Sequence, residues 1–361
     1  MKLTGFAFYR YTLPLTEPLK LAGATLHSRE GALVQLSTTG GVESWGEASP
    51  LPGFSNETLE QAVEDLSTGV SSVVGVEILE AWQQTESDLV PSARFGLETA
   101  FLNLRATAAG RTLPEMISPR PRTKVAGTTL LSGAPEEVLR LADEARRAGY
   151  RTAKLKVGGR EVEDDANLAK EVARRLGGDA VVRIDANRAW SLEDALEFVR
   201  LTHGLRLECP VEYLEEPIED PAQLREFVEK TGAPVALDES LTGMTPEDLK
   251  DHGHASAVVL KPTLLGLSRT LRFAEEATRL SMTPVVSSAY EAGVGMAALV
   301  ALAAAIGDAP AGLDTYRWLA GDVISPRLDL TAPELAVREF FAIRREVDVA
   351  GLDLVREYTQ T

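Results

Sequence analysis

Thr152-Ala-Lys154-Leu-Lys156 is a short apolar run that ends in charge, and four later runs along the chain end in charge as well. These four are Val181-Val-Arg-Ile-Asp185, Val211-Glu-Tyr-Leu-Glu215, Pro234-Val-Ala-Leu-Asp238 and Ala257-Val-Val-Leu-Lys261. Counted from Lys156, the charged ends lie 29, 30, 23 and 23 residues apart, which is about the length of one strand followed by one helix. If the strands run parallel in one sheet, their charged ends meet at a single rim.

Strand-like and helix-like segments alternate between about residue 121 and residue 320. Pro135 opens a predicted helix in which apolar residues recur at i, i+3, i+4 and i+7, and Gly149 closes it. Ser191 with Asp194 is typical of a capping box before the next apolar helix face. Eight candidate strands between residues 124 and 314 predict an α/β fold with a parallel barrel as the catalytic domain.

The chain before this region has strands first and helices after them. We expect strands at Gly31–Ser37 and Val42–Gly46, and helices near residues 56–66 and 93–109. This order predicts a separate α+β capping domain over residues 1–120. Residues 321–361 are expected to form a C-terminal segment that packs back on this domain and completes it.

The composition of the chain limits which partners it can bind and where it is expected to work. The chain has 361 residues and a formal net charge of −17, which argues against a nucleic acid or an anionic membrane as partner. The single cysteine, Cys209, excludes an intrachain disulfide and is expected to be a packing residue. The N-terminal segment lacks the features of a signal peptide, and the apolar stretch Val294–Ile306 is too short to span a bilayer, so a cytoplasmic location is the expectation.

Three of the charged ends are carboxylates. Asp185, Glu215 and Asp238 are oxygen donors from successive strands, without histidine or cysteine beside them. Such a set suits a hard cation, so Mg²⁺ is the expected metal and Mn²⁺ the second choice, while the four histidines show no zinc-ligand spacing. Taken singly, an aspartate at a strand end can equally be a turn or helix-capping residue. The repetition in consecutive units favours a functional site.

Lysines stand on both sides of the carboxylates. Lys154 and Lys156 share strand parity and therefore point to the same face, and Lys261 is expected to approach from across the barrel. A metal that binds a substrate carboxylate, with a lysine on each face, is suited to removing the proton α to that carboxylate and stabilising the resulting enolate. Glu216 and Glu239 directly follow proposed ligands, point the other way and are expected to support them.

These residues resemble the enolase superfamily, in its muconate-lactonising subgroup, and within it most closely the o-succinylbenzoate synthase family. The segments that match are Lys154-Leu-Lys156, Asp185-Ala-Asn-Arg-Ala-Trp190, Leu214-Glu-Glu-Pro217, Ala236-Leu-Asp-Glu-Ser240 and Val259-Leu-Lys-Pro-Thr-Leu-Leu-Gly266. The segment Trp45–Ser55 resembles the substrate-covering loop of that family. The likeness extends over nearly the whole chain.

The resemblance implies a modified TIM barrel of the (β/α)7β type and a defined chemistry. It implies that Asp185, Glu215 and Asp238 bind Mg²⁺, with Asn187, Glu216 and Glu239 behind them. It also implies that Lys156 takes the α-proton and then helps hydroxide leave from the same face, that Lys154 tunes Lys156, and that Lys261 stabilises the enolate. The implied reaction is a Mg-dependent β-elimination of water from 2-succinyl-6-hydroxy-2,4-cyclohexadiene-1-carboxylate, a small-molecule carboxylate of menaquinone biosynthesis.

Contacts to the rest of the substrate follow less directly from the sequence. Ser287, Ser288, Arg29 and Phe54 are the expected substrate-binding residues. The segment Ser287–Gly295 departs from the family pattern at Tyr290 and Ala292, and the loop from Leu21 to Arg29, expected to close over the substrate's tail, has no diagnostic residue.

Three alternatives remain open. A racemase of N-acylamino acids or a dipeptide epimerase would use the same metal and lysine pair, although the run after Lys261 favours the synthase. A dinucleotide-binding loop at Gly293–Ala298, with Asp314 as its acidic partner, is disfavoured because these glycines trail the preceding strand by several residues. A barrel that has lost its chemistry is disfavoured because all the key residues are present.

Overall fold

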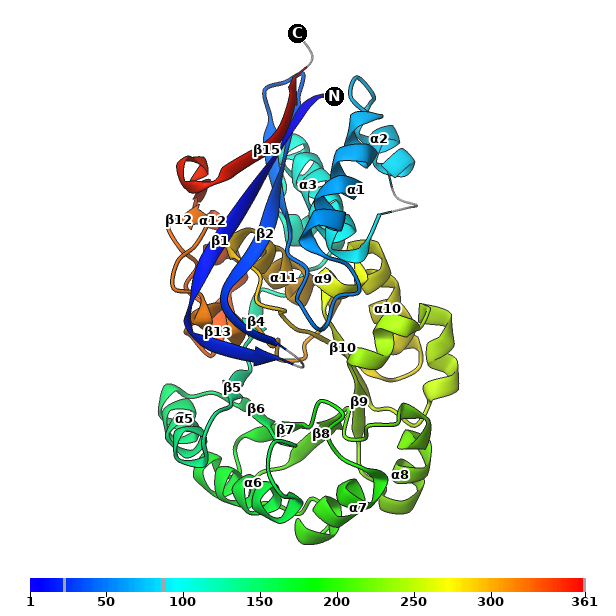
Figure 1. The fold of residues 1–361 in the computed structure, drawn as a ribbon, viewed down its shortest axis with the longest axis vertical. Helices are drawn as coiled ribbons and strands as arrows, with labels where there is room; N and C mark the ends of the chain where they lie inside the picture. Colours follow the sequence, from blue (N-terminus) through cyan, green and yellow to red (C-terminus); the bar gives the residue numbers. More distant parts are fainter. Residues whose placement is uncertain (22–23, 86–88, 360–361) are drawn as a thin grey trace.

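The structure is a computed structural model and describes residues 1–21, 24–85 and 89–359. Figure 1 shows two parts, an upper α+β part that contains both chain ends and a lower ring of strands and helices. The long β1–β2 hairpin runs from the upper part down toward the ring. The fold class expected from the sequence is confirmed.

The upper part is an antiparallel sheet with helices packed on it. Its elements are β1 (Leu3–Leu21), β2 (Ala24–Thr38), β3 (Glu43–Ala48), α1 (Leu59–Ser71), α2 (Ile78–Thr85), α3 (Pro91–Ala109) and α4 (Leu113–Ile117). A capping box between Thr58 and Gln61 begins α1, and Gly110 in the left-handed region ends α3. The expected loop from Leu21 to Arg29 is instead part of the β1–β2 hairpin, because Leu19 pairs with Leu26 and the pairing continues to Ala24. Residues 22–23 of that loop lie outside the described residues.

The end of the chain returns to this sheet. β15 (Asp353–Thr359) pairs antiparallel with β1, giving the strand order β15-β1-β2-β3. The preceding elements are β12 (Ile324–Ser325), β13 (Glu334–Ala336), α12 (Val337–Ala342) and β14 (Glu346–Val347). β13 pairs with β4 (Lys124–Ala126), which lies just before the ring. Residues near both ends of the chain therefore build one layer.

The ring is a parallel sheet with the strand order β11-β10-β9-β8-β7-β6-β5. Its strands are β5 (Thr129–Leu131), β6 (Thr152–Lys156), β7 (Val181–Asp185), β8 (Val211–Glu215), β9 (Val235–Leu237), β10 (Ala257–Leu260) and β11 (Thr283–Val286). The expected eighth strand near Gly312 is reduced to two isolated bridges, Gly127 with Ala311 and Ser287 with Gly312. These bridges join the two outer strands of the sheet and complete the barrel.

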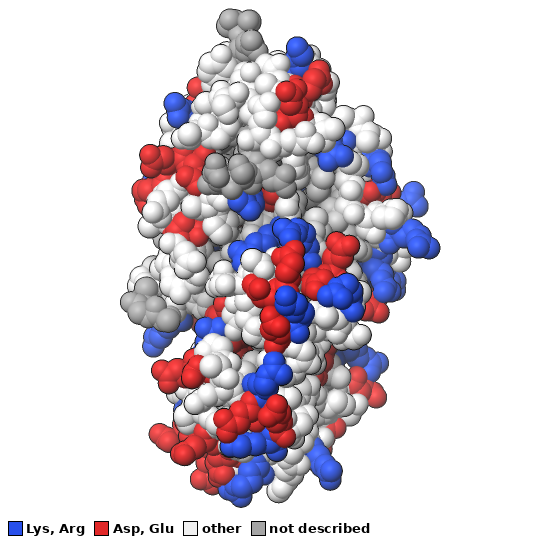
Figure 2. Space-filling view, turned by 90° about the vertical axis from the view of Figure 1, so that its right-hand side faces the viewer, with Lys and Arg blue, Asp and Glu red and all other residues white. Residues whose placement is uncertain are grey.

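Helices cover the outside of the barrel. They are α5 (Pro135–Ala148), α6 (Val162–Leu176), α7 (Leu192–Leu201), α8 (Leu224–Thr231), α9 (Pro262–Leu265), α10 (Leu267–Arg279) and α11 (Gly293–Ile306). The helix starts and ends expected from the sequence are found in the structure. α5 begins at Pro135 and ends before Gly149, which is in the left-handed region, and Ser191 and Asp194 form the capping box of α7. Figure 2 shows basic and acidic side chains interspersed on one face of the molecule. Ion pairs such as Arg279–Glu276 form on the barrel helices.

Side chains along each barrel strand point alternately to the inside and the outside of the barrel. Leu155, Ile184 and Leu214 point outward and pack under the barrel helices in one large buried cluster. α11 is apolar on nearly all sides because it lies in a second cluster shared by the barrel and the upper part. Among the described residues, no helix is both long and apolar enough to cross a membrane.

Candidate active site at the carboxyl ends of the barrel strands

The charged residues singled out in the sequence lie at the carboxyl ends of five neighbouring strands. Lys154 and Lys156 are on β6, Asp185 ends β7, Glu215 ends β8, Asp238 follows β9 and Lys261 follows β10. The register places Lys156 beside Asp185, and Asp185 beside Glu215. Parallel strands end on the same side of a barrel, so the structure brings all six side chains to one rim.

Direct contacts link the lysines to the carboxylates. The Lys154 Nζ lies 2.7 Å from Asp185 Oδ2 and 2.7 Å from Glu215 Oε1. The Lys156 Nζ lies 2.6 Å from Asp185 Oδ2, and Lys261 forms an ion pair with Asp238. The side chains of Asp185 and Glu215 are 0% exposed, so these charges are compensated by one another and not by solvent.

Burial and neighbouring charge act against each other in this cluster. Burial alone would lower the pKa of Lys154, but the carboxylates of Asp185 and Glu215 outweigh it and raise that pKa well above its usual value. The two lysines hold the pKa of Asp185 far below its usual range despite its burial. Burial, followed by the charge of Asp185, raises the pKa of Glu215 to about 8. At this rim, the lysines favour the charged form of Asp185, whereas burial still disfavours the charged form of Glu215.

The donor set fits a divalent cation. Within the described part of the chain, no three His, Cys, Asp or Glu side chains already stand together as a ready set of metal ligands, and each carboxylate at this rim contacts a lysine ammonium instead. Glu215 Oε2 is nevertheless buried and has no hydrogen-bond partner. An unpaired carboxylate oxygen among three buried carboxylates is the kind of donor that Mg²⁺ or Mn²⁺ takes.

Asn187 contacts Lys156 in addition to Asp185, and Glu239 in turn binds Asn187. The Lys156 Nζ donates to Asn187 Oδ1 at 2.5 Å, and Asn187 Nδ2 donates to Glu239 Oε1 at 2.9 Å. Because the amide nitrogen of Asn187 is engaged by a carboxylate, its oxygen is turned toward the lysine. These two residues therefore fix where the ammonium group of Lys156 lies.

Glu216 supports Asp238 through the backbone. Its Oε1 accepts from the backbone nitrogens of Asp238 at 2.9 Å and Ser240 at 2.8 Å. Its Oε2 accepts from Arg188 Nε at 3.0 Å. The sequence reasoning did not single out Arg188, although it lies inside the segment Asp185–Trp190. No signal in the sequence marked Arg188, because its left-handed backbone, with a φ of 60°, is visible only in the structure.

The expected substrate-binding residues occupy different positions. Phe54, from the loop after β3, places its ring 5.4 Å from Lys261 Nζ, so the upper part reaches the rim at this point. Ser288 Oγ donates to the Gly312 carbonyl at 2.9 Å, and Ser287 Oγ makes only a 3.5 Å contact to the same oxygen. Arg29 is buried, and its three nitrogens donate to the carbonyls of Tyr290, Ser49 and Pro50. Contact of these four residues with a substrate stays a prediction.

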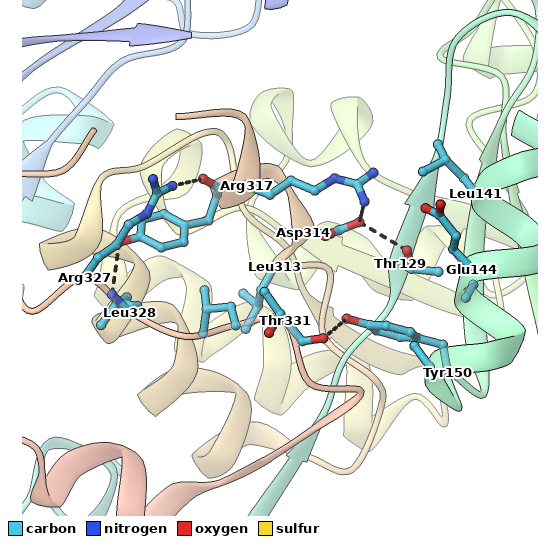
Figure 3. A pocket seen from close by; sticks show the side chains of 14 residues that line it. Thr129, Leu141, Glu144, Tyr150, Leu313, Asp314, Arg317, Arg327, Leu328 and Thr331 are labelled. Atoms are coloured by element: carbon cyan, nitrogen blue, oxygen red, sulfur yellow. Dashed lines mark hydrogen bonds and ion pairs between the residues drawn. The ribbon is translucent and has the colours of Figure 1, made fainter. Parts of the chain in front are cut away.

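A cavity of about 410 Å³ lies elsewhere, between α5 and the segments that follow the last barrel strand (Figure 3). In this place a five-residue 3-10 helix, Asp314–Trp318, follows the strand instead of a full helix. Polar groups that line the cavity bind one another. Asp314 accepts from Thr129, and the Tyr150 hydroxyl donates to the Thr331 carbonyl at 3.1 Å. None of the residues expected to act in the site lines this cavity.

Comparison with known proteins identifies similar sequences and folds. Residues 137–342 match the family model described as "Enolase C-terminal domain-like", and residues 3–104 match "MenC, N-terminal domain". The chain is 33% identical over 334 residues to the o-succinylbenzoate synthase of Yersinia pseudotuberculosis, covering 92% of this chain and 96% of that protein.

Solved structures show the same fold at lower identity. The muconate lactonizing enzyme of Pseudomonas fluorescens superposes with a TM-score of 0.82 at 24% identity, covering 98% of this chain and 96% of that one. The L-Ala-D/L-Glu epimerase of Bacillus subtilis superposes with a TM-score of 0.83 at 22% identity, covering 99% and 100%. Both share a capping domain over a TIM-barrel-like domain with this chain.

Proposed function

The chain belongs to the o-succinylbenzoate synthase family of the enolase superfamily, and from that membership we propose how its charged rim works. The enzyme is a hydro-lyase: it eliminates water from 2-succinyl-6-hydroxy-2,4-cyclohexadiene-1-carboxylate and releases 2-succinylbenzoate, a step of menaquinone biosynthesis. Aromatisation makes the product stable, so the catalytic task is to reach the enediolate that precedes loss of hydroxide.

Enzymes of this superfamily use a divalent metal, and we assign its site to Asp185, Glu215 and Asp238, with Mg²⁺ as the metal and Mn²⁺ as a substitute. The three carboxylates are buried at the ends of adjacent strands, and one oxygen of Glu215 lacks a hydrogen-bond partner. The bound cation would supply positive charge that the substrate's carboxylate and the developing enediolate require, in a protein whose net charge is −17.

Lys156 is the proposed base. It stands at the end of β6, where Asn187 and Asp185 fix the position of its nitrogen. In its neutral form it takes the α-proton, and the ammonium so formed returns a proton to the departing hydroxide on the same face of the ring. A single group can serve both steps because the elimination is syn.

Lys154 and Lys261 are the proposed electrostatic partners of that step. Lys154 lies between Asp185 and Glu215 on the same strand as the base, where its charge adds to the positive field at the rim. Lys261 comes from β10, beyond the three carboxylate strands, and its charge faces the substrate from the side opposite Lys156. The observation that carries this proposal is the placement of lysines on both sides of three buried carboxylates at one rim.

An assay of the purified protein tests the function directly. With Mg²⁺ present, the cyclohexadiene substrate is expected to disappear as the ultraviolet absorbance of the aromatic product rises. Treatment with a chelator should stop the reaction, and added Mg²⁺ should restore it. Unchanged substrate in the presence of Mg²⁺ would contradict the proposed function.

Racemisation of N-acylamino acids, or epimerisation of dipeptides, is the second candidate. The arrangement of Lys156 and Lys261 on opposite sides supports it, because one lysine can remove the α-proton and the other can return it to the opposite face. Incubation of N-succinylamino acids in deuterated water distinguishes the two activities. Rapid α-deuterium incorporation without dehydratase activity would favour the racemase, whereas dehydration with slow exchange favours the synthase.

A further inference from the structure

The charged rim leaves one arc of the barrel mouth free. The lysines and carboxylates occupy the ends of β6 to β10, so β11, the bridging segment at Ala311–Gly312 and β5 form the remaining arc. A substrate whose ring carboxylate faces the cation that Asp185, Glu215 and Asp238 would hold has this arc available for its acyl tail. This inference rests on the proposed function, because it takes that substrate as the ligand.

Tyr290 stands on this arc in a strained backbone conformation. It lies four residues after the end of β11, and its φ is 63°, a region that aromatic residues rarely enter. Arg29 holds it there by donating from Nε to the Tyr290 carbonyl at 3.2 Å. The same guanidinium binds the carbonyls of Ser49 and Pro50 in the loop that leads to Phe54. The fold therefore keeps Tyr290 in an unfavourable conformation with a buried cation.

A contact with Trp318 orients the ring of Tyr290, whereas its hydroxyl makes no hydrogen bond within the described residues. The ring packs edge-on against Trp318, with centroids 6.4 Å apart and planes at 87°. In the described part of the chain the hydroxyl has no hydrogen-bond partner. Burial raises the pKa of Tyr290 to about 12, although the nearby charges of Lys261 and Lys154 act to lower it. The hydroxyl is thus a protonated donor within the field of the two site lysines.

Ser288 and Arg29, two other polar residues at this arc, already make hydrogen bonds within the protein. The Ser288 hydroxyl contacts the Gly312 carbonyl and Thr315 Oγ1, at 2.9 and 2.6 Å. Each of the three guanidinium nitrogens of Arg29 donates to a backbone carbonyl. We propose that the Tyr290 hydroxyl donates a hydrogen bond to an oxygen of the substrate's acyl tail and thereby selects acylated ring carboxylates. This residue is one of the two positions at which the sequence departs from the family pattern.

Binding of product analogues to Tyr290→Phe tests the assignment. The Kd values of 2-succinylbenzoate, which carries the tail, and of benzoate, which lacks it, are measured by calorimetry with Mg²⁺ present. The Kd of 2-succinylbenzoate should rise about 10-fold in the variant, as expected for loss of one hydrogen bond to a polar or charged acceptor, and the Kd of benzoate should not change. Steady-state rates should show a raised KM and a nearly unchanged kcat.

Tyr150→Phe is the matched control, because it removes a tyrosine hydroxyl in the separate cavity, where Tyr150 contacts Thr331 (Figure 3). It should leave both Kd values unchanged. Equal Kd values for 2-succinylbenzoate in wild type and Tyr290→Phe, with turnover intact, would overturn the role of Tyr290 and leave the proposed function standing. Absence of turnover in the wild type would contradict the function itself, and absence of 2-succinylbenzoate binding by the wild type would overturn both.

Discussion

Single side chains at the rim are defined by their partners more than by their type. Lys154 and Lys156 share one strand face, yet Lys154 lies between two carboxylates while Lys156 contacts one carboxylate and the amide of Asn187. The second arrangement leaves Lys156 less enclosed by negative charge, with its side chain 33% exposed against 14% for Lys154. This asymmetry supports Lys156 as the residue that exchanges a proton with the substrate.

Lys156→Ala should therefore lose turnover and keep the metal site. Removal of a general base typically lowers the rate by about 10²- to 10⁴-fold, and here the same residue also assists the leaving group, so a loss near the upper end is expected. Mg²⁺ binding, measured by calorimetry, should persist because the three carboxylates remain. Lys230→Ala on the exposed face of α8 serves as the control. Retained activity in Lys156→Ala would falsify the role given to this lysine.

Phe54 is the residue through which the upper part contacts Lys261. A cation–π contact contributes about 1 kcal/mol, so Phe54→Leu should raise the KM for the cyclohexadiene substrate about fivefold. The Mg²⁺ concentration for half-maximal activity should not change, since Phe54 touches no carboxylate of the site. Phe341→Leu, in a phenylalanine of α12 that packs on Phe340, is the control. A change in Mg²⁺ dependence alone would argue against a substrate-facing role for Phe54.

At the scale of elements, the close approach of β3 and α3 fixes the upper part. Gly46 on β3 and Gly96 on α3 face each other, and a Cβ on Gly46 would lie 1.8 Å from the Gly96 carbonyl oxygen. The backbones touch because neither residue has a side chain. This contact holds β3, and with it the loop that carries Phe54, against the helix.

Gly46→Ala should consequently destabilise the protein. The new methyl group meets backbone atoms that cannot move aside, and overpacking of this kind costs about 1–3 kcal/mol of unfolding free energy. Gly253→Ala is the control, because no atom lies within 4 Å of its added Cβ and its backbone is not left-handed. Urea unfolding of both variants measures the difference. Equal stability of the two would show that α3 can shift away from β3.

At the scale of the whole molecule, buried polar contacts join the two parts. Glu47 on β3 accepts from Tyr11 and from the backbone nitrogens of Ala292 and Gly295 at the start of α11, each at 2.7 Å. Glu98 on α3 accepts from the Ser268 nitrogen of α10 at 3.0 Å. Upper-part carboxylates thus bind the amino ends of barrel helices, where the helix dipole favours negative charge. The position of the covering loops over the rim depends on these contacts.

Glu47 gives the assembled molecule a pH dependence. Burial outweighs the three hydrogen bonds and raises the Glu47 pKa from 4.5 to about 7. A carboxyl whose folded pKa exceeds its unfolded pKa binds more protons when folded, so its contribution to stability is complete below about pH 4.5 and is lost as pH rises through about 7. A shift of this size corresponds to roughly 3 kcal/mol.

Comparison with Glu47→Gln isolates that contribution. The unfolding free energy of the wild type minus that of the variant, from urea titrations between pH 4.5 and pH 8, should fall as pH rises through this range. A difference that grows with pH would mean that the hydrogen bonds from Tyr11 and α11 dominate and that the Glu47 pKa is lowered instead. Glu30→Gln, an exposed position on β2, provides the control.

The amino-acid pattern was sufficient to predict the barrel, its helices and the side chains that meet at its rim. Strand parity and capping are local, so Lys154, Asp185, Glu215 and Lys261 could be placed at strand ends from the apolar pattern alone. The fold class, predicted from the alternation of strands and helices, and the family, predicted from the resemblance of the motifs, are both confirmed. The roles of the individual site residues remain predictions.

The arc opposite the proposed metal ligands is built by contacts that only the folded chain reveals. Arg29 binds the carbonyl of Tyr290, 261 positions away, where Tyr290 has a left-handed backbone, and the expected contact of Arg29 with a substrate remains a prediction. The pairing of β15 with β1 likewise joins the two ends of the chain. Backbone groups are much the same at nearly every position, so the sequence does not indicate which of them a distant side chain will contact. Contacts made to them by distant side chains therefore become visible only when the chain has folded.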